Sequence, residues 1–174
     1  MILAGVDADT TKLVVCLLSG EPPAAPTDVN WLTAVLRDAR GTFVHACQAA
    51  PSALALALAG IRIDEAYVER AWGNERRSDF PLGAIFGATT IALANVSPGC
   101  HVEEMPAHQW KKTVTAAVGL TTKKGDPGLG NAPKPVANEA CRRILRDHNV
   151  DSVGLTPDQL DAFGIAYAGW TAGR

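Results

Sequence analysis

The chain contains 174 residues, and 47% of them are hydrophobic. Its 16 basic and 18 acidic residues leave a net charge of −2. This size suits one domain with a buried core and is too short for two, and the near balance of charge by itself neither requires nor excludes a polyanionic partner.

The charge is unevenly distributed along the chain. Residues 69–146 hold eleven Lys or Arg against seven Asp or Glu, whereas residues 1–68 hold four against seven and residues 147–174 hold one against four. A local basic excess of this kind is expected of a surface that faces phosphates.

The cysteines and the apolar segments exclude several classes of protein. Cys16, Cys47, Cys100 and Cys141 stand far apart, without a Cys-x-x-Cys pair, so neither a zinc knuckle nor a disulfide scaffold is indicated. The N-terminus has no basic region before its apolar run, and no apolar stretch is long enough to span a bilayer. We therefore expect a cytoplasmic protein with reduced thiols and no membrane partner.

The first part of the chain predicts β-structure. Residues 1–6 and 13–18 are apolar and β-branched, and the polar connection 7–12 is short enough to join them as an antiparallel hairpin. The proline-rich residues 21–26 predict a loop. Residues 29–37 fit either a helix or a strand, and periodicity alone does not decide between them.

The middle of the chain predicts two helices around a short strand. Residues 38–60 are rich in Ala and Leu and favour a helix, with Pro51 as a break or a new first turn and Gly60 as a stop. Residues 66–69 predict a strand that ends in a carboxylate, and residues 80–95 predict a long helix.

The last part of the chain predicts one more strand and three helices. The strand covers residues 100–105 and the first helix covers 106–117. Residues 119–135 are rich in Gly, Pro and Lys and predict a mobile basic loop. A helix over 136–148 follows, and a final helix begins after Thr156, which can cap it.

Four carboxylates suggest a common site. Asp7 and Glu69 end two predicted strands, and Asp158 and Asp161 lie three apart at the start of the last helix, where they share a face. Clustered acids repel one another, so a fold that gathers them generally needs a cation to hold them. Oxygen ligands without Cys or His indicate Mg²⁺ or Mn²⁺, and two such ions can drive phosphodiester hydrolysis.

The order of elements resembles that of the RuvC-type Holliday junction resolvases in the RNase H-like (retroviral integrase) superfamily, phage-encoded members included. The resemblance covers nearly the whole chain, and its most specific segments are residues 5–7, 67–72, 109–114 and 158–166. It implies an α/β RNase H-like fold in a single nuclease domain over residues 1–174. The sheet would be mixed and five-stranded, with its first three strands antiparallel and helices on both faces, which makes residues 29–36 a strand.

The resemblance also assigns roles to individual residues. Asp7, Glu69, Asp158 and Asp161 would be a catalytic tetrad that binds two Mg²⁺ or Mn²⁺ ions, and Lys111 would lie near the scissile phosphate. Either Lys123 or Lys134 would match a second lysine of the family, and the sequence leaves this choice open. For each lysine, a solvated surface position is the alternative.

Further residues are expected to contact DNA or a second copy of the chain. Trp72 would stack at the junction crossover, with a core tryptophan as the alternative. The other DNA-binding residues would be Arg70, Arg76, Arg77, Lys112, Lys123, Lys124 and Lys134. On the helix over 80–95, Gly83, Phe86 and Gly87 would form a homodimer seam, with packing inside one chain as the alternative for the two glycines.

One departure from the family pattern is visible. Where the family has Pro-Gly after its first Asp, this chain has Ala8-Asp9. Asp9 is either an extra metal contact or a turn former, and its charge places strict selectivity for junctions in question.

The predicted function is a metal-dependent, structure-selective endonuclease that resolves four-way DNA junctions by symmetric cleavage in DNA recombination and repair, in a bacterium or a phage-infected host. A broader branched-DNA or flap endonuclease and a YqgF-like RNA-processing nuclease are alternatives within the fold. A non-catalytic DNA-structure-binding protein and an ATPase of the actin or sugar-kinase kind are alternatives outside it. No motif identifies a branch-migration motor as a partner.

Overall fold

A mixed sheet forms the centre of the molecule, which is a computed structural model that describes residues 1–9, 11–22, 24–36, 42–70 and 79–173. Its strands are β1 (Ile2–Ala8), β2 (Lys12–Ser19), β3 (Asp28–Val35), β4 (Glu65–Arg70) and β5 (His101–Pro106). They form one five-stranded sheet in the order β3-β2-β1-β4-β5. β1, β2 and β3 pair antiparallel, and β4 and β5 continue the sheet in parallel with β1. The predicted mixed sheet is therefore confirmed, and residues 29–36 lie mainly in a strand.

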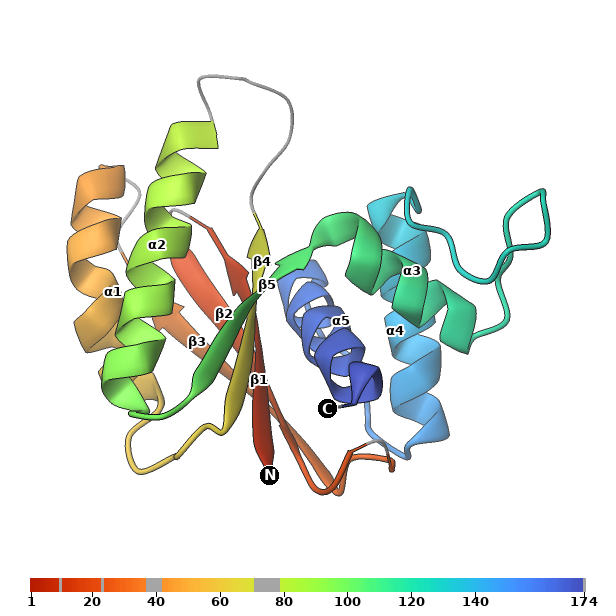
Figure 1. Ribbon diagram of the computed structural model, residues 1–174, viewed down its shortest axis with the longest axis horizontal. Helices are drawn as coiled ribbons and strands as arrows, with labels where there is room; N and C mark the ends of the chain where they lie inside the picture. The colour runs from red at the N-terminus through yellow and green to blue at the C-terminus, as the bar shows by residue number, and fades with distance from the viewer. Residues whose placement is uncertain (10, 23, 37–41, 71–78, 174) are drawn as a thin grey trace.

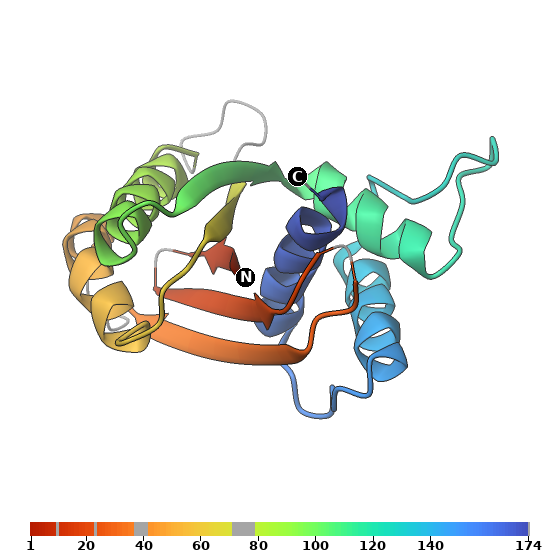
Figure 2. The same ribbon diagram turned by 60° about the horizontal axis from the view of Figure 1, so that its bottom comes forward.

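Helices cover both faces of the sheet (Figure 1). One face carries α1 (Phe43–Ala57) and α2 (Asp79–Val96), and the other carries α3 (Ala107–Ala117), α4 (Lys134–Asp147) and α5 (Pro157–Ala172). α5 packs directly on β1 and β2, while α3 and α4 pack on the outer side of α5 (Figure 2). α5 is thus buried between the sheet and two helices, which explains why it is apolar nearly all round.

The alternation of side chains along β1 divides the core in two. Leu3 belongs to the cluster under α5, whereas Ala4 and Val6 belong to the cluster under α1 and α2. Asp7 lies an even number of residues from Leu3 and so points to the same side of β1, the face that α5 covers. The strand that ends in a carboxylate therefore presents it to the last helix.

Gly5 allows α5 to approach β1 closely. A Cβ at this position would lie 2.7 Å from the Cα of Ala166 and closer still to the backbone nitrogen of Ala166 and the carbonyl oxygen of Ala162. Strand and helix backbones therefore touch here, and no residue with a side chain fits without a shift. Because α5 carries Asp158 and Asp161, this contact also sets their distance from Asp7.

A second glycine, Gly164 on α5, makes room for Trp110 of α3. A Cβ at Gly164 would lie 2.6 Å from Cε3 of the Trp110 ring, which is itself buried at 1% exposure. The indole therefore lies close against α5 at Gly164, and its Nε1 reaches Glu69 on the sheet.

Two predicted features differ from the structure. Pro51 lies inside α1 and does not break it. It is exposed on the outer face, so the carbonyl that loses its helical N–H partner can turn to water. Residues 119–133 are irregular, as predicted, but they are held against α3: the Leu129 N–H donates to Thr115 Oγ1 at 2.6 Å, and Gly128 packs on the backbone of Lys112. Among the described residues, no helix has both the length and the apolarity to cross a bilayer.

Candidate functional site

The start of α5 is fixed by a capping box. Thr156 Oγ1 accepts from the Gln159 N–H at 3.3 Å, and Gln159 Oε1 accepts from the Thr156 N–H at 2.9 Å. Pro157, at the first helical position, has a backbone that suits this start. The helix register is therefore defined at its first turn, and Asp158 and Asp161 project from it toward the sheet.

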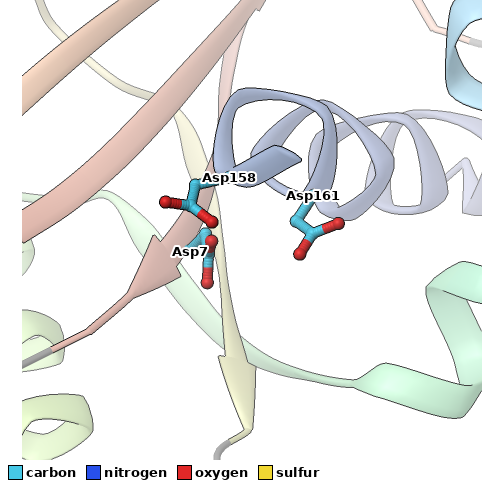
Figure 3. Close-up of side chains that lie close together, drawn as sticks. All are labelled: Asp7, Asp158 and Asp161. Atoms are coloured by element: carbon cyan, nitrogen blue, oxygen red, sulfur yellow. The ribbon is translucent and has the colours of Figure 1, made fainter. Parts of the chain in front are cut away.

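Three carboxylates converge where β1 ends and α5 begins. One oxygen each from Asp7, Asp158 and Asp161 lies within 4.8 Å of the others (Figure 3). Asp161 is only 5% exposed, and its Oδ1 is buried with no hydrogen-bond partner in the described part of the chain. A buried acceptor without a donor is costly, so this oxygen is suited to a cation that arrives from outside the chain.

Glu69 lies beside this group at the end of β4. It follows Val68, the residue that pairs with Val6, so Glu69 and Asp7 end neighbouring parallel strands on the same face. Glu69 is not one of the three acids whose oxygens converge; its Oε1 accepts from Trp110 Nε1 at 2.9 Å. No local signal predicts this contact, because the two residues are 41 positions apart.

The cluster carries more negative charge than its surroundings balance. Burial, with the charges of Glu69, Asp161 and Asp158, raises the pKa of Asp7 to about 8. Burial also raises the pKa of Glu69, against the hydrogen bond from Trp110, and that of Asp161, against the hydrogen bond from Lys134. A bound cation would stabilise the ionised forms of these three carboxylates.

Two lysines contact the carboxylates directly. Lys134 Nζ lies 2.6 Å from Asp161 Oδ2 and 3.5 Å from Asp158 Oδ1. Lys12 Nζ lies 2.8 Å from Asp158 Oδ2, and its hydrogen bond lowers the pKa of Asp158. Lys123, the other choice for the second family lysine, is exposed on the segment that follows α3.

Sequence reasoning missed Lys12, although a signal was present. Lys12 begins β2, and its side chain shares a face with Val14, which pairs with Asp7 across the hairpin. Alternation along β2 therefore points Lys12 toward the acidic edge of the sheet.

The structure describes some of the other residues predicted to contact DNA, but not all of them. Lys111 Nζ lies 5.7 Å from the centre of the Trp110 ring, and its charge partly offsets the burial that raises the pKa of both Glu69 and Asp161. Lys112 is exposed on α3, and Lys123 and Lys124 are exposed beyond it. The predictions for Trp72, Arg76, Arg77 and the side chain of Arg70 fall outside the described residues.

Asp9 helps to form the hairpin turn. Its N–H donates to the Lys12 carbonyl at 3.1 Å, and its Oδ2 accepts from Thr11 Oγ1 at 3.2 Å. Asp9 also lines a small pocket of about 180 Å³ with Asp7, Lys12, Lys134 and Asp158. Its turn-forming contacts are present, and its side chain lies at the rim of the acidic site.

The proposed dimer residues on α2 differ in their surroundings. A Cβ added at Gly83 or Gly87 would meet nothing within 4 Å in the part of the chain that is described. Phe86 is half-buried and packs against the core between α2 and the sheet. Close packing inside the chain therefore does not explain the two glycines.

The donor set fits a hard divalent ion. Every side chain that converges offers carboxylate oxygens, which Mg²⁺ and Mn²⁺ prefer, and the orphaned Asp161 Oδ1 points to a ligand position. Asp7, Asp161 and Asp158 can supply ligands as they stand, with Glu69 at the edge of the same group.

Comparisons with known proteins agree with this geometry at the level of the fold. No protein-family model matches the chain, and no curated protein matches its sequence. Among solved structures, Thermus thermophilus RuvC superposes with a TM-score of 0.69 at 19% identity, covering 97% of this chain and 92% of that one. T. thermophilus RuvC in complex with a Holliday junction substrate gives 0.67 at 15% identity, covering 97% and 91%. The chain thus has the RuvC variant of the RNase H-like fold over nearly its whole length.

Proposed function

We propose that this protein is a metal-dependent endonuclease that resolves four-way DNA junctions. The observation that carries the proposal is the convergence of Asp7, Asp158 and Asp161, together with the buried Asp161 Oδ1 that has no partner among the described residues. It occurs at the carboxyl end of parallel strands in a fold whose solved neighbours include RuvC with a Holliday junction substrate.

The roles of the residues follow from their positions. Asp7, Glu69, Asp158 and Asp161 would hold two Mg²⁺ or Mn²⁺ ions, and Trp110 would fix the Glu69 carboxylate for this task. When bound, such ions supply an activated water and stabilise the leaving oxygen in phosphodiester hydrolysis, with 5′-phosphate and 3′-hydroxyl products. Lys111, whose charge acts on two of the acids, would position the scissile phosphate, and Lys134 would balance Asp161.

The DNA would extend from the acidic site across the exposed basic side chains of α3 and the segment after it. Lys112, Lys123 and Lys124 are exposed there, so their ammonium groups are accessible to DNA phosphates. The proposed setting is the cytoplasm of a bacterium or of a phage-infected cell, in DNA recombination or repair.

A homodimer would match the symmetry of the substrate. A four-way junction has two equivalent strands of like polarity, and an isologous pair presents two equivalent sites to them. The open face of α2 at Gly83 and Gly87, with Phe86 beside it, is the surface that we assign to this contact.

Cleavage of a synthetic four-way junction tests the proposal. With Mg²⁺ or Mn²⁺, Asp161→Asn and Asp7→Asn should bind junctions in a gel-shift assay but cleave them about a hundredfold more slowly or worse, because ligands of the ions are lost. The matched control is Asp151→Asn, whose exposed side chain accepts a hydrogen bond from the Val153 N–H. Cleavage by Asp161→Asn at the parent rate would refute the assignment.

The choice of substrate separates the alternatives within the fold. The same assay should compare four-way junctions, three-way junctions, flapped duplexes and structured RNA. Faster cleavage of flaps would indicate a broader branched-DNA nuclease, and cleavage of RNA alone would indicate a YqgF-like enzyme. Junction binding without any cleavage would indicate a DNA-structure-binding protein.

A further inference from the structure

The acids of the site are not equivalent in their partners. Both oxygens of Asp158 face ammonium groups: Oδ2 lies 2.8 Å from Lys12 Nζ, and Oδ1 lies 3.5 Å from Lys134 Nζ. Asp161 has one oxygen paired with Lys134 and one buried oxygen without a partner among the described residues. We call Asp7, Glu69 and Asp161 the inner acids and Asp158 the outer acid.

The inner and outer acids differ in burial and in their contacts with cations as well. Asp161 is buried, Asp7 and Glu69 are half-buried, and Lys134 contacts Asp161 directly. The outer acid is ion-paired twice, and its pKa is lowered. A divalent ion therefore meets two ammonium groups at the outer acid, whereas at the inner acids it meets one ammonium group and a buried oxygen that is unpartnered among the described residues.

Lys12 is the residue that creates this difference. Lys134 bridges Asp158 and Asp161, so it affects both halves of the site. Lys12 forms its ion pair with Oδ2 of Asp158 and lines the small pocket with Asp9 and Asp7. Its side chain is 37% exposed, so it can swing toward solvent when another cation takes its place.

We propose that Lys12 is a resident counter-cation that weakens binding of a divalent ion at Asp158, so that the inner acids fill first and the outer position fills second. This inference rests on the proposed metal site and adds an order of filling to it. An ion at Asp158 competes with the Lys12 ammonium if it binds Oδ2, and it is repelled by the nearby Lys12 charge if it binds Oδ1. Lys12 is a positioning residue, since it acts through Asp158.

Calorimetric titration of the full chain with Mn²⁺ tests the proposal. The parent should bind one ion tightly and a second ion weakly. Lys12→Gln should bind the second ion on the order of tenfold more tightly, because a unit charge a few Å from a divalent ion is removed, while the first affinity changes by less than about threefold. Lys12→Arg, which keeps the charge, should resemble the parent.

Two further variants guard the interpretation. Arg62→Gln removes an exposed cation just before β4, at the end of that strand opposite Glu69, and should leave both affinities unchanged. Lys12→Met keeps the length of the side chain without its charge and should reproduce Lys12→Gln, provided that thermal melting in EDTA shows both variants folded. Equal second-ion affinity in the parent, Lys12→Gln and Lys12→Met would overturn the inference, as would equal affinity of the two ions in the parent.

The outcome is separable from that of the proposed function. If Lys12→Gln tightens the second ion but neither protein cleaves branched DNA, the order of filling stands and the nuclease assignment fails. If the parent cleaves junctions and the lysine variants leave Mn²⁺ binding unchanged, the assignment stands and the role of Lys12 fails. A parent that binds no Mn²⁺ overturns both.

Discussion

The substitution Gly5→Ala tests whether the contact between β1 and α5 sets the geometry of the site. A methyl group at this position would lie 2.7 Å from the Cα of Ala166 and closer to two other backbone atoms. These atoms belong to a helix buried between the sheet and two helices, so they cannot rotate away as a side-chain end would. Either α5 or β1 must shift.

The expected loss of stability is large for one methyl group. Overpacking a core typically costs about 1–3 kcal/mol when side chains can adjust, and here the collision is with backbone, so we expect about 3 kcal/mol or more. For a domain of this length, each kcal/mol lowers Tm by roughly 2–4 °C. The melting temperature should therefore fall by about 6–12 °C.

Thermal denaturation followed by circular dichroism measures this loss, with Gly60→Ala as the control. Gly60 has φ +78 and nothing within 4 Å of an added Cβ, so alanine there costs about 1–2 kcal/mol of backbone strain without a collision. Gly5→Ala should also weaken Mn²⁺ binding, because the shift moves Asp7 away from Asp158 and Asp161. If Gly5→Ala melts within 1 °C of the parent, the close approach does not constrain the fold as argued.

Two other predictions concern the charge of the site and the assembly. The pKa of Asp7 is raised from 3.8 to about 8, so between these pH values the folded protein without metal keeps a proton that the unfolded chain releases. The free energy of unfolding should therefore fall as pH rises from about 4 to 8, by up to about 1.4 kcal/mol per pH unit. Asp7→Asn in EDTA should remove much of this slope in urea denaturation at pH 5 and 8, and an unchanged slope would assign it to other groups. For the dimer, Gly87→Arg should shift sedimentation equilibrium toward the monomer. The control Val153→Arg should not, because Val153 is 88% exposed and lies between α4 and α5, on the face opposite α2. A Gly87→Arg dimer as stable as the parent dimer would place the dimer interface elsewhere.

Much of the fold could be predicted because local signals and topology agreed. Apolar strands that end in Asp7 and Glu69 place both carboxylates at one edge of the sheet, since parallel strands share that edge. Thr156 and Pro157 mark the start of α5 by their own backbone and side-chain chemistry, which fixes Asp158 and Asp161 on one face. The cap of α5 follows a short-range rule, whereas the pairing of β1 with β4 joins distant segments and was implied by the resemblance to the RuvC-type resolvases.

The rest depended on contacts between distant segments. The choice between Lys123 and Lys134 could not be made from the sequence, because it depends on how residues 119–133 fold back against Thr115 and Lys112. The contact between Trp110 and Glu69 likewise depends on the room that Gly164 leaves. Local rules predict a break or a new first turn at Pro51, whereas the exposure of its helix face, which makes the proline tolerable inside α1, is a tertiary property.

The packing of Trp110 against Gly164 restricts the order in which these positions can change over time. An alanine at position 164 would lie 2.6 Å from the indole, so it would push away the ring whose Nε1 holds Glu69. A lineage that keeps the tryptophan must therefore keep the glycine, and a smaller residue has to replace Trp110 before position 164 is free to vary. Substitution in the interior of this protein is thus linked to the position of the Glu69 carboxylate.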